Sequence, residues 1–299
     1  MKKWMKVTGI SVVSASLLLA GCQAEENAKA DSKNAILEEK VVPGKQIALE
    51  GAINVRDLRG YKTEDGKTIK PHRLIRSAEL YTITGNDIAK LKKTYQLKQI
   101  VDFRTDSEVD KKPDPPIQNV KNTHDSVMKD NGASTSTEDL IKSLSKMDNP
   151  ESFLIEANKS FVTDENSRKA YKKFFDILLE NKEGAVLWHC TAGKDRAGFG
   201  TALVLSALGV PKDKVMEDYL LSNKYRADEN EKAVQAVLAE TKNQQAADGM
   251  KAVMEVRESY LNAAFDEIDK KYGSLDAFLK EGLGLTKSDI NKLKSMYLV

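Results

Sequence analysis

The sequence predicts an α/β fold in which helices flank a central, mostly parallel sheet and the C-terminal part is helical. Short apolar segments typical of buried strands alternate with longer segments of helical periodicity up to position 208. Beyond that position only helical periodicity remains. The chain has 299 residues, of which 40% are hydrophobic and 31% charged, a composition that suits a globular chain with a buried core.

The N-terminal segment 1–21 has the layout of a bacterial lipoprotein signal peptide. A lysine-rich start, MKKWMK, precedes an apolar run that ends in LAGC at Cys22. This run is shorter than the roughly 20 apolar residues that a membrane-spanning helix needs. The ending resembles the lipobox, so we expect lipidation at Cys22 and an extracytoplasmic protein anchored to the bacterial cell membrane. A plain anchor helix, or a secreted protein cut elsewhere, is the alternative.

Charge and cysteine content narrow the function classes. Cleavage before Cys22 would remove three lysines, which leaves 44 basic against 45 acidic side chains. Nucleic-acid binders usually carry a strong basic excess, so no nucleic-acid partner is expected. Cys190 is the only cysteine besides Cys22, which excludes a disulfide framework. A lone thiol in an exported chain indicates chemistry, the alternative being a buried structural cysteine.

The polar segment 22–45 is predicted to be a flexible tether before a folded domain at 46–299. The first elements expected in that domain are a strand around 73–76, a helix at 84–95 and a strand at 99–104. The proline-containing segment 111–150 is predicted to be a long loop or mobile insertion with a short helix near 138–144. Such a loop can be a lid over a site or simply disordered, and the sequence does not separate the two.

The second half of the chain is predicted to contain one buried strand, AVLWH, between two helices. Helices are then expected to continue to the C-terminus. The predicted ranges are 168–179 and 196–208 for the two flanking helices, then 216–225, 229–241, 249–272, 274–281 and 286–297.

The stretch HCTAGKDR at 189–196 lies between that strand and the helix that follows it. Backbone N–H groups at a helix N-terminus are unpaired and carry partial positive charge, so a tight loop there can cradle an anion. The small residues Ala192 and Gly193 would let a phosphate approach the backbone. A nucleotide-binding Walker loop is excluded because Asp195, rather than Ser or Thr, follows Gly193-Lys194.

Two side chains of this stretch carry chemistry. The helix N-terminus and the neighbouring cations favour the thiolate form of Cys190, which is the nucleophilic form. The guanidinium of Arg196 can bind two oxygens of a phosphoryl group and stabilise charge in the transition state. Nucleophile, anion cradle and clamp therefore fall within eight residues.

Other mechanisms fit the sequence less well. In a cysteine protease the neighbouring His189 would point to the opposite face of the strand, which leaves His72 and His124 as candidate bases. A zinc site lacks ligands, because the chain has two cysteines and three scattered histidines. We therefore expect no metal and no cofactor.

HCTAGKDRAG resembles the signature loop of cysteine-dependent protein tyrosine phosphatases, especially the bacterial tyrosine/serine phosphatase branch. NVRDLRGYKTEDGK, VDFRTDSE, DYLLSN and YGSLDAFLKEGLGL are also similar to blocks of that branch. The resemblance covers most of 46–299. It implies a protein tyrosine phosphatase-like fold and hydrolysis of phosphomonoesters through a phosphocysteine intermediate.

The resemblance also implies roles for individual residues. Cys190 would be the nucleophile and Arg196 the phosphate clamp, and Asp195 would be the general acid, with Asp102 or Asp106 in reserve. The phosphate would be bound by the backbone amides of Thr191, Ala192, Gly193, Lys194, Asp195 and Arg196.

Two departures from the family pattern stand out. Ala197 occupies a position where these loops usually carry Ser or Thr, so hydrolysis of the phosphocysteine is expected to be slow. Arg59 replaces a glycine, which is expected to alter a turn. The implied substrate is a phosphorylated protein, with tyrosine or dual tyrosine/serine specificity. The alternatives are a phosphoinositide, favoured by the charge of Lys194, and a lipoprotein that binds phosphate without turnover.

Overall fold

The computed structural model describes residues 41–130 and 149–299, and residues 42–299 form one compact unit. Within this part, five strands form one sheet in the order β1-β2-β5-β3-β4, with the edge strand β1 antiparallel and the other pairs parallel. The predicted α/β fold with a mostly parallel sheet is confirmed. The strands are β1 (Arg56–Asp57), β2 (Leu74–Ser77), β3 (Leu97–Asp102), β4 (Lys121–His124) and β5 (Ala185–His189).

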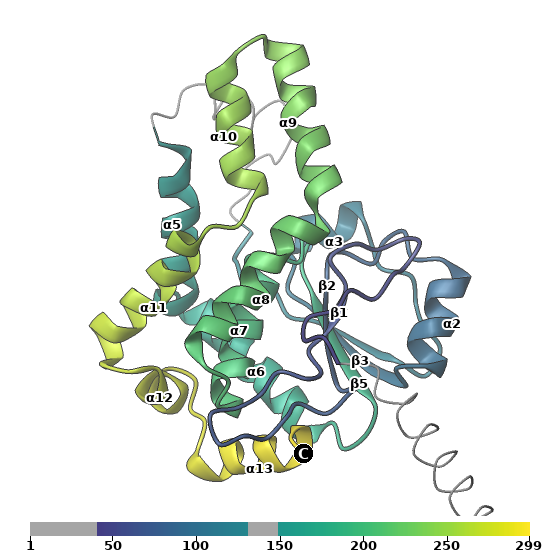
Figure 1. The fold of residues 1–299 in the computed structure, drawn as a ribbon, viewed down its shortest axis with the longest axis vertical. Helices are drawn as coiled ribbons and strands as arrows, with labels where there is room; N and C mark the ends of the chain where they lie inside the picture. The colour runs from purple at the N-terminus through teal and green to yellow at the C-terminus, as the bar shows by residue number, and fades with distance from the viewer. Residues whose placement is uncertain (1–40, 131–148) are drawn as a thin grey trace, which may run out of the picture. The chain divides into compact units, whose positions relative to one another are not determined.

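The central strand β5 is buried along its whole length because helices cover both faces of the sheet (Figure 1). Alternate side chains of β5 therefore enter different cores. Leu187 packs into the core beside α2 (Gly85–Lys93). Trp188 packs into the larger core beside α6 (Glu165–Glu180) and α7 (Arg196–Leu208), where its ring lies 5.1 Å from that of Phe174. Burial on both faces explains why AVLWH has no polar alternation.

The carboxyl ends of the parallel strands meet at one edge of the sheet. Ser77 at the end of β2 and Asp102 at the end of β3 both lie opposite His189 at the end of β5. Cys190 follows directly, so the HCTAGKDR loop lies at this edge. In open parallel sheets, ligands usually bind beyond this edge.

The segment predicted as a loop or insertion holds more regular structure than its composition indicated. Strand β4 lies within it, and α3 (Asp106–Lys111) ends at its start. All four β4 residues are polar and exposed or half-buried, so no apolar pattern identified this edge strand. The helix α5 (Pro150–Thr163) begins where the segment ends. The helix expected at 138–144 lies outside the described residues, as do the signal peptide and most of the tether.

The C-terminal part is helical, as predicted. The last helix packs against α6 and α7, and Tyr297 donates a hydrogen bond to the Leu178 carbonyl. The elements are α8 (Lys212–Tyr225), α9 (Ala227–Thr241), α10 (Gln244–Met254), α11 (Glu258–Tyr272), α12 (Leu275–Ala277), the π-helix η1 (Phe278–Gly282) and α13 (Lys287–Tyr297).

The single helix predicted at 249–272 is wrong, because the chain breaks between α10 and α11. Asn223 on α8 donates to the Val256 carbonyl and accepts from the Val256 N–H, both at 2.8 Å. These two bonds pair the backbone N–H and C=O of Val256 and replace the hydrogen bonds that a continuous helix would make there. The periodicity of the sequence continues across the break, so the pattern gave no sign of it.

No helix in the described ranges is both long enough and apolar enough to span a bilayer.

Candidate active site

The HCTAGKDR loop turns tightly against β2. Gly193 has a φ of +68°, and a Cβ at this position would lie 2.3 Å from the carbonyl oxygen of Ser77. Glycine is required here for both reasons. The close approach of Gly193 to β2 fixes the depth at which the loop lies.

The loop carbonyls are held from outside by side chains of other segments. Asn54 donates to the carbonyls of Ala192 at 3.2 Å and Gly193 at 3.0 Å. Arg76 donates to the Gly193 carbonyl at 2.7 Å, and Arg226 to the Ala192 carbonyl at 3.2 Å. Because the N–H and C=O of a peptide unit point in opposite directions, fixing these carbonyls outward turns the amides inward.

The inward amides are available to a ligand. None of the backbone N–H groups of residues 191–196 donates to another residue in the described ranges. Asp195 is the N-cap of α7 but makes no side-chain capping bond, so the first turn of that helix also stays open. This arrangement can bind an anion such as phosphate at the predicted position.

Cys190 lies at the base of this cradle and is only 2% exposed. Arg196 lies beside it. Burial lowers the pKa of Arg196, but the hydrogen bonds to Glu108 and the negative charges of Cys190 and Glu108 outweigh burial and raise that pKa above its usual value. The guanidinium therefore stays charged and places a fixed positive charge beside the Cys190 sulfur.

Glu108 on α3 orients the clamp, a role that the sequence analysis missed. Its carboxylate accepts two bonds from Arg196, from Nη1 at 2.6 Å and from Nη2 at 2.9 Å, and a third from the Thr191 hydroxyl. Burial raises the pKa of Glu108, but the Arg196 bonds and charge lower it to about 2. The only sequence signal was the capping box, Thr105 with Glu108, which predicts a helix start rather than an ion pair.

A second ion-pair network lies behind the loop. Asp218 on α8 binds Arg56 at 2.9 Å and Arg76 at 2.7 Å, and all three side chains are at most 1% exposed. Arg56 also donates to the Asn54 side chain at 2.6 Å. The NVRDLRG and DYLLSN blocks thus meet here, and the network holds Asn54 and Arg76, two of the three residues that fix the loop carbonyls.

Lys194 and Asp195 form a pair at the end of the loop. The Lys194 ammonium lies 2.8 Å from Asp195 Oδ2 and donates to the Glu255 carbonyl at 3.2 Å. Lys194 is buried, so its charge is committed to these two partners. The other carboxylate oxygen, Oδ1 of Asp195, is buried and has no partner among the described residues. Asp195 is therefore the loop carboxylate with a free oxygen.

The two reserve acids lie elsewhere. Asp102 is buried and accepts bonds from the guanidinium of Arg104 on both oxygens. Asp106 is exposed at the start of α3, 3.6 Å from the ring of His124. Neither carboxylate has a hydrogen bond or ion pair with residues 191–196 in the described ranges.

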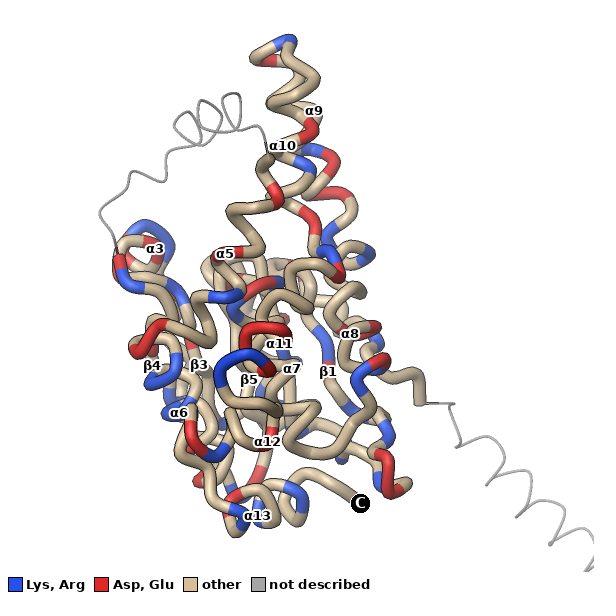
Figure 2. The backbone as a smooth tube through the Cα atoms, turned by 90° about the vertical axis from the view of Figure 1, so that its left-hand side faces the viewer, with Lys and Arg blue, Asp and Glu red and all other residues tan. Residues whose placement is uncertain are grey.

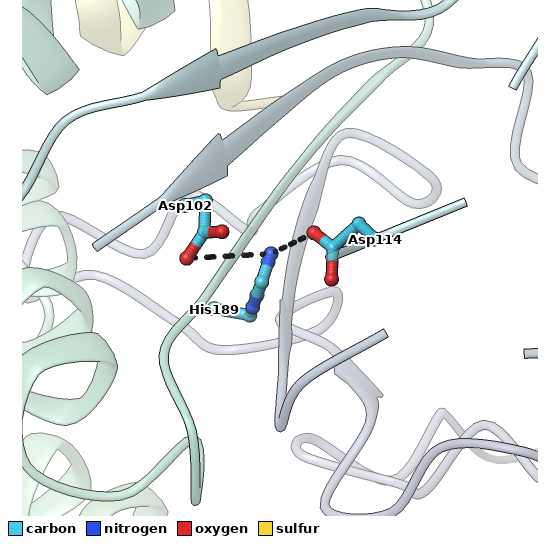
Figure 3. Close-up of side chains that lie close together, drawn as sticks. All are labelled: Asp102, Asp114 and His189. Atoms are coloured by element: carbon cyan, nitrogen blue, oxygen red, sulfur yellow. Dashed lines mark ion pairs between the residues drawn. The ribbon is translucent and has the colours of Figure 1, made fainter. Parts of the chain in front are cut away.

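His189 points away from the cradle, as strand alternation predicts. Its ring lies between the carboxylates of Asp114, at 2.9 Å, and Asp102, at 3.8 Å (Figure 3). Burial lowers the pKa of His189, but the charges of Asp102 and Asp114 and the hydrogen bond to Asp114 outweigh burial and raise it. A buried imidazole shared by two carboxylates is a poor base for Cys190.

These three residues have the composition of a metal site, but their surroundings do not suit a cation. The buried guanidinium of Arg104 binds Asp102 at 2.7 Å and Asp114 at 2.8 Å. Arg104 therefore already supplies the positive charge that a metal would bring. A metal would have to displace Arg104 from both carboxylates.

The remaining histidines lie away from Cys190. His72 precedes β2 and is therefore at the opposite end of the sheet from the loop. The Nε2 atom of His124 lies 2.7 Å from the Arg104 carbonyl oxygen. Neither histidine is near Cys190 to act as a protease base.

The two departures from the family pattern have clear local settings. Ala197 is fully buried, and its carbonyl accepts bonds from Trp188 and Thr201. Arg59 does not have a positive φ. Gly60 alone supplies it, at +84°, so the turn needs no glycine at position 59. An arginine at position 59 is therefore compatible with this turn.

A cavity of ≈ 800 Å³ opens beside the loop. Thr191, Ala192 and Arg226 line it on the loop side, and residues of 50–53, 78–84 and α9 form its walls. A cavity of this size can hold a small ligand.

In comparison with known proteins, the model of the tyrosine phosphatase family matches residues 47–299 of the chain. The chain belongs to the tyrosine phosphatase family. This family member is 30% identical to the triple specificity protein phosphatase PtpB of Mycobacterium tuberculosis over 282 residues, which cover 84% of the chain and 98% of PtpB. It is 31% identical over 267 residues to a Cupriavidus necator protein named as a tyrosine-protein phosphatase, covering 84% of the chain and 88% of that protein.

Two solved structures of TpbA from P. aeruginosa are also similar to this tyrosine phosphatase family member. One is TpbA itself, at 17% identity, and the other is a Cys-to-Ser variant in complex with pTyr, at 16% identity. Each comparison covers 63% of the chain and 89% of TpbA, with a TM-score of 0.28.

Proposed function

We propose that the chain is a cysteine-dependent phosphomonoester hydrolase, a protein tyrosine phosphatase with tyrosine or dual tyrosine/serine specificity. The observation that carries this proposal is the set of inward, unpaired amides at 191–196 around Cys190, with Arg196 oriented beside them. Family membership supports the same activity.

The reaction has two steps. The Cys190 sulfur attacks phosphorus and forms the S–P bond while the P–O bond to the leaving group breaks, and Asp195 gives its proton to the departing oxygen. A water molecule then attacks phosphorus and transfers a proton to the Asp195 carboxylate. The S–P bond breaks, which releases inorganic phosphate and restores the thiolate. Arg196 and the amides stabilise the phosphoryl charge in both steps.

Two neighbours tune these steps. Lys194 holds Oδ2 of Asp195 at 2.8 Å, which leaves Oδ1 as the oxygen that carries the transferred proton. Ala197 offers no hydroxyl to stabilise the leaving thiolate in the second step. We therefore expect the phosphocysteine intermediate to accumulate during turnover.

The proposed setting is the outer face of the bacterial cell membrane. The lipobox-like ending at Cys22 supports a lipid anchor, and the polar segment 22–45 supports a tether between the anchor and the catalytic domain. The proposed substrates are then phosphorylated proteins outside the cytoplasm.

A phosphoinositide is the second candidate substrate. The charge of Lys194 does not support it, because its ammonium is bound to Asp195 and Glu255. The cations that line the cavity beside the loop are Arg226 and Lys232. This observation keeps the candidate open.

Phosphate release tests the proposal. Phosphotyrosyl peptides, phosphoseryl peptides and phosphoinositides would be compared with wild type and Cys190→Ser. We expect release from the tyrosyl peptides by wild type and loss of release in the variant. Unchanged release in Cys190→Ser would refute the mechanism, and tight oxyanion binding without turnover by wild type would indicate a phosphate-binding lipoprotein instead.

A further inference from the structure

The backbone that connects α10 and α11 lies close to the carboxylate that we propose as the general acid. Residues 255–257 form this connection. The carbonyl of Glu255 accepts a hydrogen bond from the Lys194 ammonium at 3.2 Å, and the same ammonium lies 2.8 Å from Oδ2 of Asp195. One lysine therefore links the connection to Asp195.

Asn223 on α8 sets the direction of the Glu255 carbonyl. Its Oδ1 accepts a bond from the Val256 N–H at 2.8 Å, and its amide donates to the Val256 carbonyl at 2.8 Å. The Val256 N–H and the Glu255 C=O belong to one planar peptide unit, in which the two groups point in opposite directions. Asn223 holds the N–H side of this unit, which directs the carbonyl side at Lys194.

Lys194 depends on this carbonyl because it is buried. Only 5% of the residue is exposed, and a buried ammonium is costly unless it has acceptors. Within the described part of the chain, its partners are the Glu255 carbonyl and Oδ2 of Asp195, while Oδ1 of Asp195 is buried without a partner. If the carbonyl turned away, the ammonium would be free to bind both carboxylate oxygens. The Glu255 carbonyl therefore keeps Oδ1 open.

The helices on either side of the connection are held by other contacts. Arg257 binds the carboxylate of Glu151 on α5, and Tyr260 on α11 donates to the Ala252 carbonyl on α10 at 3.0 Å. The helices α9 and α10 pack against each other and rise together above the rest of the chain (Figure 2). None of these contacts involves Asn223, so its two bonds act on the connection rather than on the helices.

We propose that Asn223 is a positioning residue for the general acid. Through the peptide unit of Glu255 and Val256 it directs a carbonyl at Lys194, and Lys194 then stays on Oδ2 of Asp195. The other oxygen, Oδ1, is left to give its proton to the departing oxygen as the P–O bond breaks. This inference rests on the proposed phosphatase function, in which Asp195 is the acid, and deepens it.

The test compares two leaving groups of similar shape. Phenol is a much weaker acid than para-nitrophenol, so phenyl phosphate needs the proton of the general acid more than para-nitrophenyl phosphate does. We expect Asn223→Ala to lower kcat/KM by about tenfold on phenyl phosphate and by about twofold or less on para-nitrophenyl phosphate, the effect of losing one positioning hydrogen bond. The ratio of the two values does not depend on how much of the variant is folded.

Asn166→Ala is the matched control. Asn166 on α6 is half-buried like Asn223, and its side-chain amide also donates to the backbone of another segment, the Ser126 carbonyl at 2.9 Å. This variant should leave the ratio unchanged. An equal loss on both esters in Asn223→Ala would overturn the proposal, because it would show that Asn223 only supports the fold. No loss on either ester would overturn it too.

A double variant tests whether Asn223 acts through Asp195. In the Asp195→Asn background the proton donor is gone, so Asn223→Ala should cause no further loss on phenyl phosphate. A second loss of about tenfold in that background would show that Asn223 acts by another route, and would contradict the proposal.

An NMR measurement separates this inference from the proposed function. If wild type hydrolyses neither ester, the proposed function fails. The ammonium signal of Lys194 in lysine-labelled protein, assigned by its absence in Lys194→Arg, then still reports whether the ammonium is fixed. We expect Asn223→Ala to shift or broaden this signal and Asn166→Ala to leave it in place. An unchanged signal in Asn223→Ala would refute the inference on its own.

Discussion

The two ion-pair networks around the signature loop use the same chemistry in different surroundings. Behind the loop, Asp218 pairs with two arginines, and all three side chains are at most 1% exposed. On the ligand side, Glu108 pairs with Arg196 through side chains that are 24% and 12% exposed. Water and ligand can reach the second network and not the first.

This difference separates support from chemistry. The buried network cannot exchange its partners for water or ligand. Asp218 and Arg56 therefore hold Asn54 and Arg76 in place, and these two residues in turn fix the loop carbonyls. The exposed pair can reorganise, so Arg196 can bind phosphate while Glu108 keeps its guanidinium in plane. Breaking the sealed side should therefore unfold the protein, and breaking the open side should change catalysis in a folded protein.

The largest expected effect is on the sealed side. Asp218→Asn leaves two buried guanidinium groups without their anion, and we expect the free energy of unfolding to fall by about 3–5 kcal/mol. Urea denaturation measures this change. Asp213→Asn, on the exposed side of the same helix, is the matched control and should change stability by less than about 0.5 kcal/mol. Equal stability of the two variants would contradict a structural role for the network.

The next effect is on the general acid. Asp195→Asn should lower kcat by about 100-fold on alkyl phosphates, whose leaving groups need a proton, and less on aryl phosphates with acidic phenols. Steady-state kinetics across leaving groups measures the difference. Asp106→Asn is the control, because its carboxylate is exposed and lies beside His124. An equal loss on every substrate would exclude Asp195 as the acid.

Glu108→Gln should lower kcat by about tenfold, because Arg196 loses the charged hydrogen bonds that align its guanidinium. The variant should remain folded. Because the pKa of Glu108 is lowered from 4.5 to about 2, its stabilising pair is fully present above pH 4.5 and lost as pH falls toward 2. The stability difference between wild type and variant should therefore shrink over that range, as unfolding at several pH values can show. A difference that stays constant would contradict the pair.

The smallest expected effect is a gain. Ala197→Ser would supply a hydroxyl for the leaving thiolate in the second step, and we expect turnover to rise by about threefold. The burst of leaving group in pre-steady-state kinetics should become smaller. Ala202→Ser, in the same buried helix but away from the loop, serves as a control for the added hydroxyl. An unchanged burst would show that the second step is not limiting.

Much of the fold could be predicted from the sequence. The buried strand AVLWH is a continuous apolar run, and the helices that flank it have strong local periodicity. The sequence therefore placed Cys190 directly after the strand and Arg196 at the start of the helix. Strand β4 and the break at Val256 could not be predicted in this way. β4 is a short polar edge strand, and the break depends on hydrogen bonds from Asn223, which lies 33 residues away in sequence.

The same limit applies to the site. The resemblance to phosphatase loops pointed to the groups that we propose act on phosphate, and these groups occur within eight residues. The residues that orient them, such as Glu108, Asp218 and Arg226, come from distant segments. Their roles depend on which segments the sheet and the helices bring together, and no local pattern reports that.

The central claim is that Cys190 forms a covalent bond to phosphorus. Mass spectrometry of enzyme quenched in acid during turnover of a phosphotyrosyl peptide tests it directly. The account predicts a phosphoryl group on the proteolytic fragment that contains Cys190, and none in Cys190→Ser. Product formed at full rate with no phosphoryl group on Cys190, or with one on another residue, would contradict it.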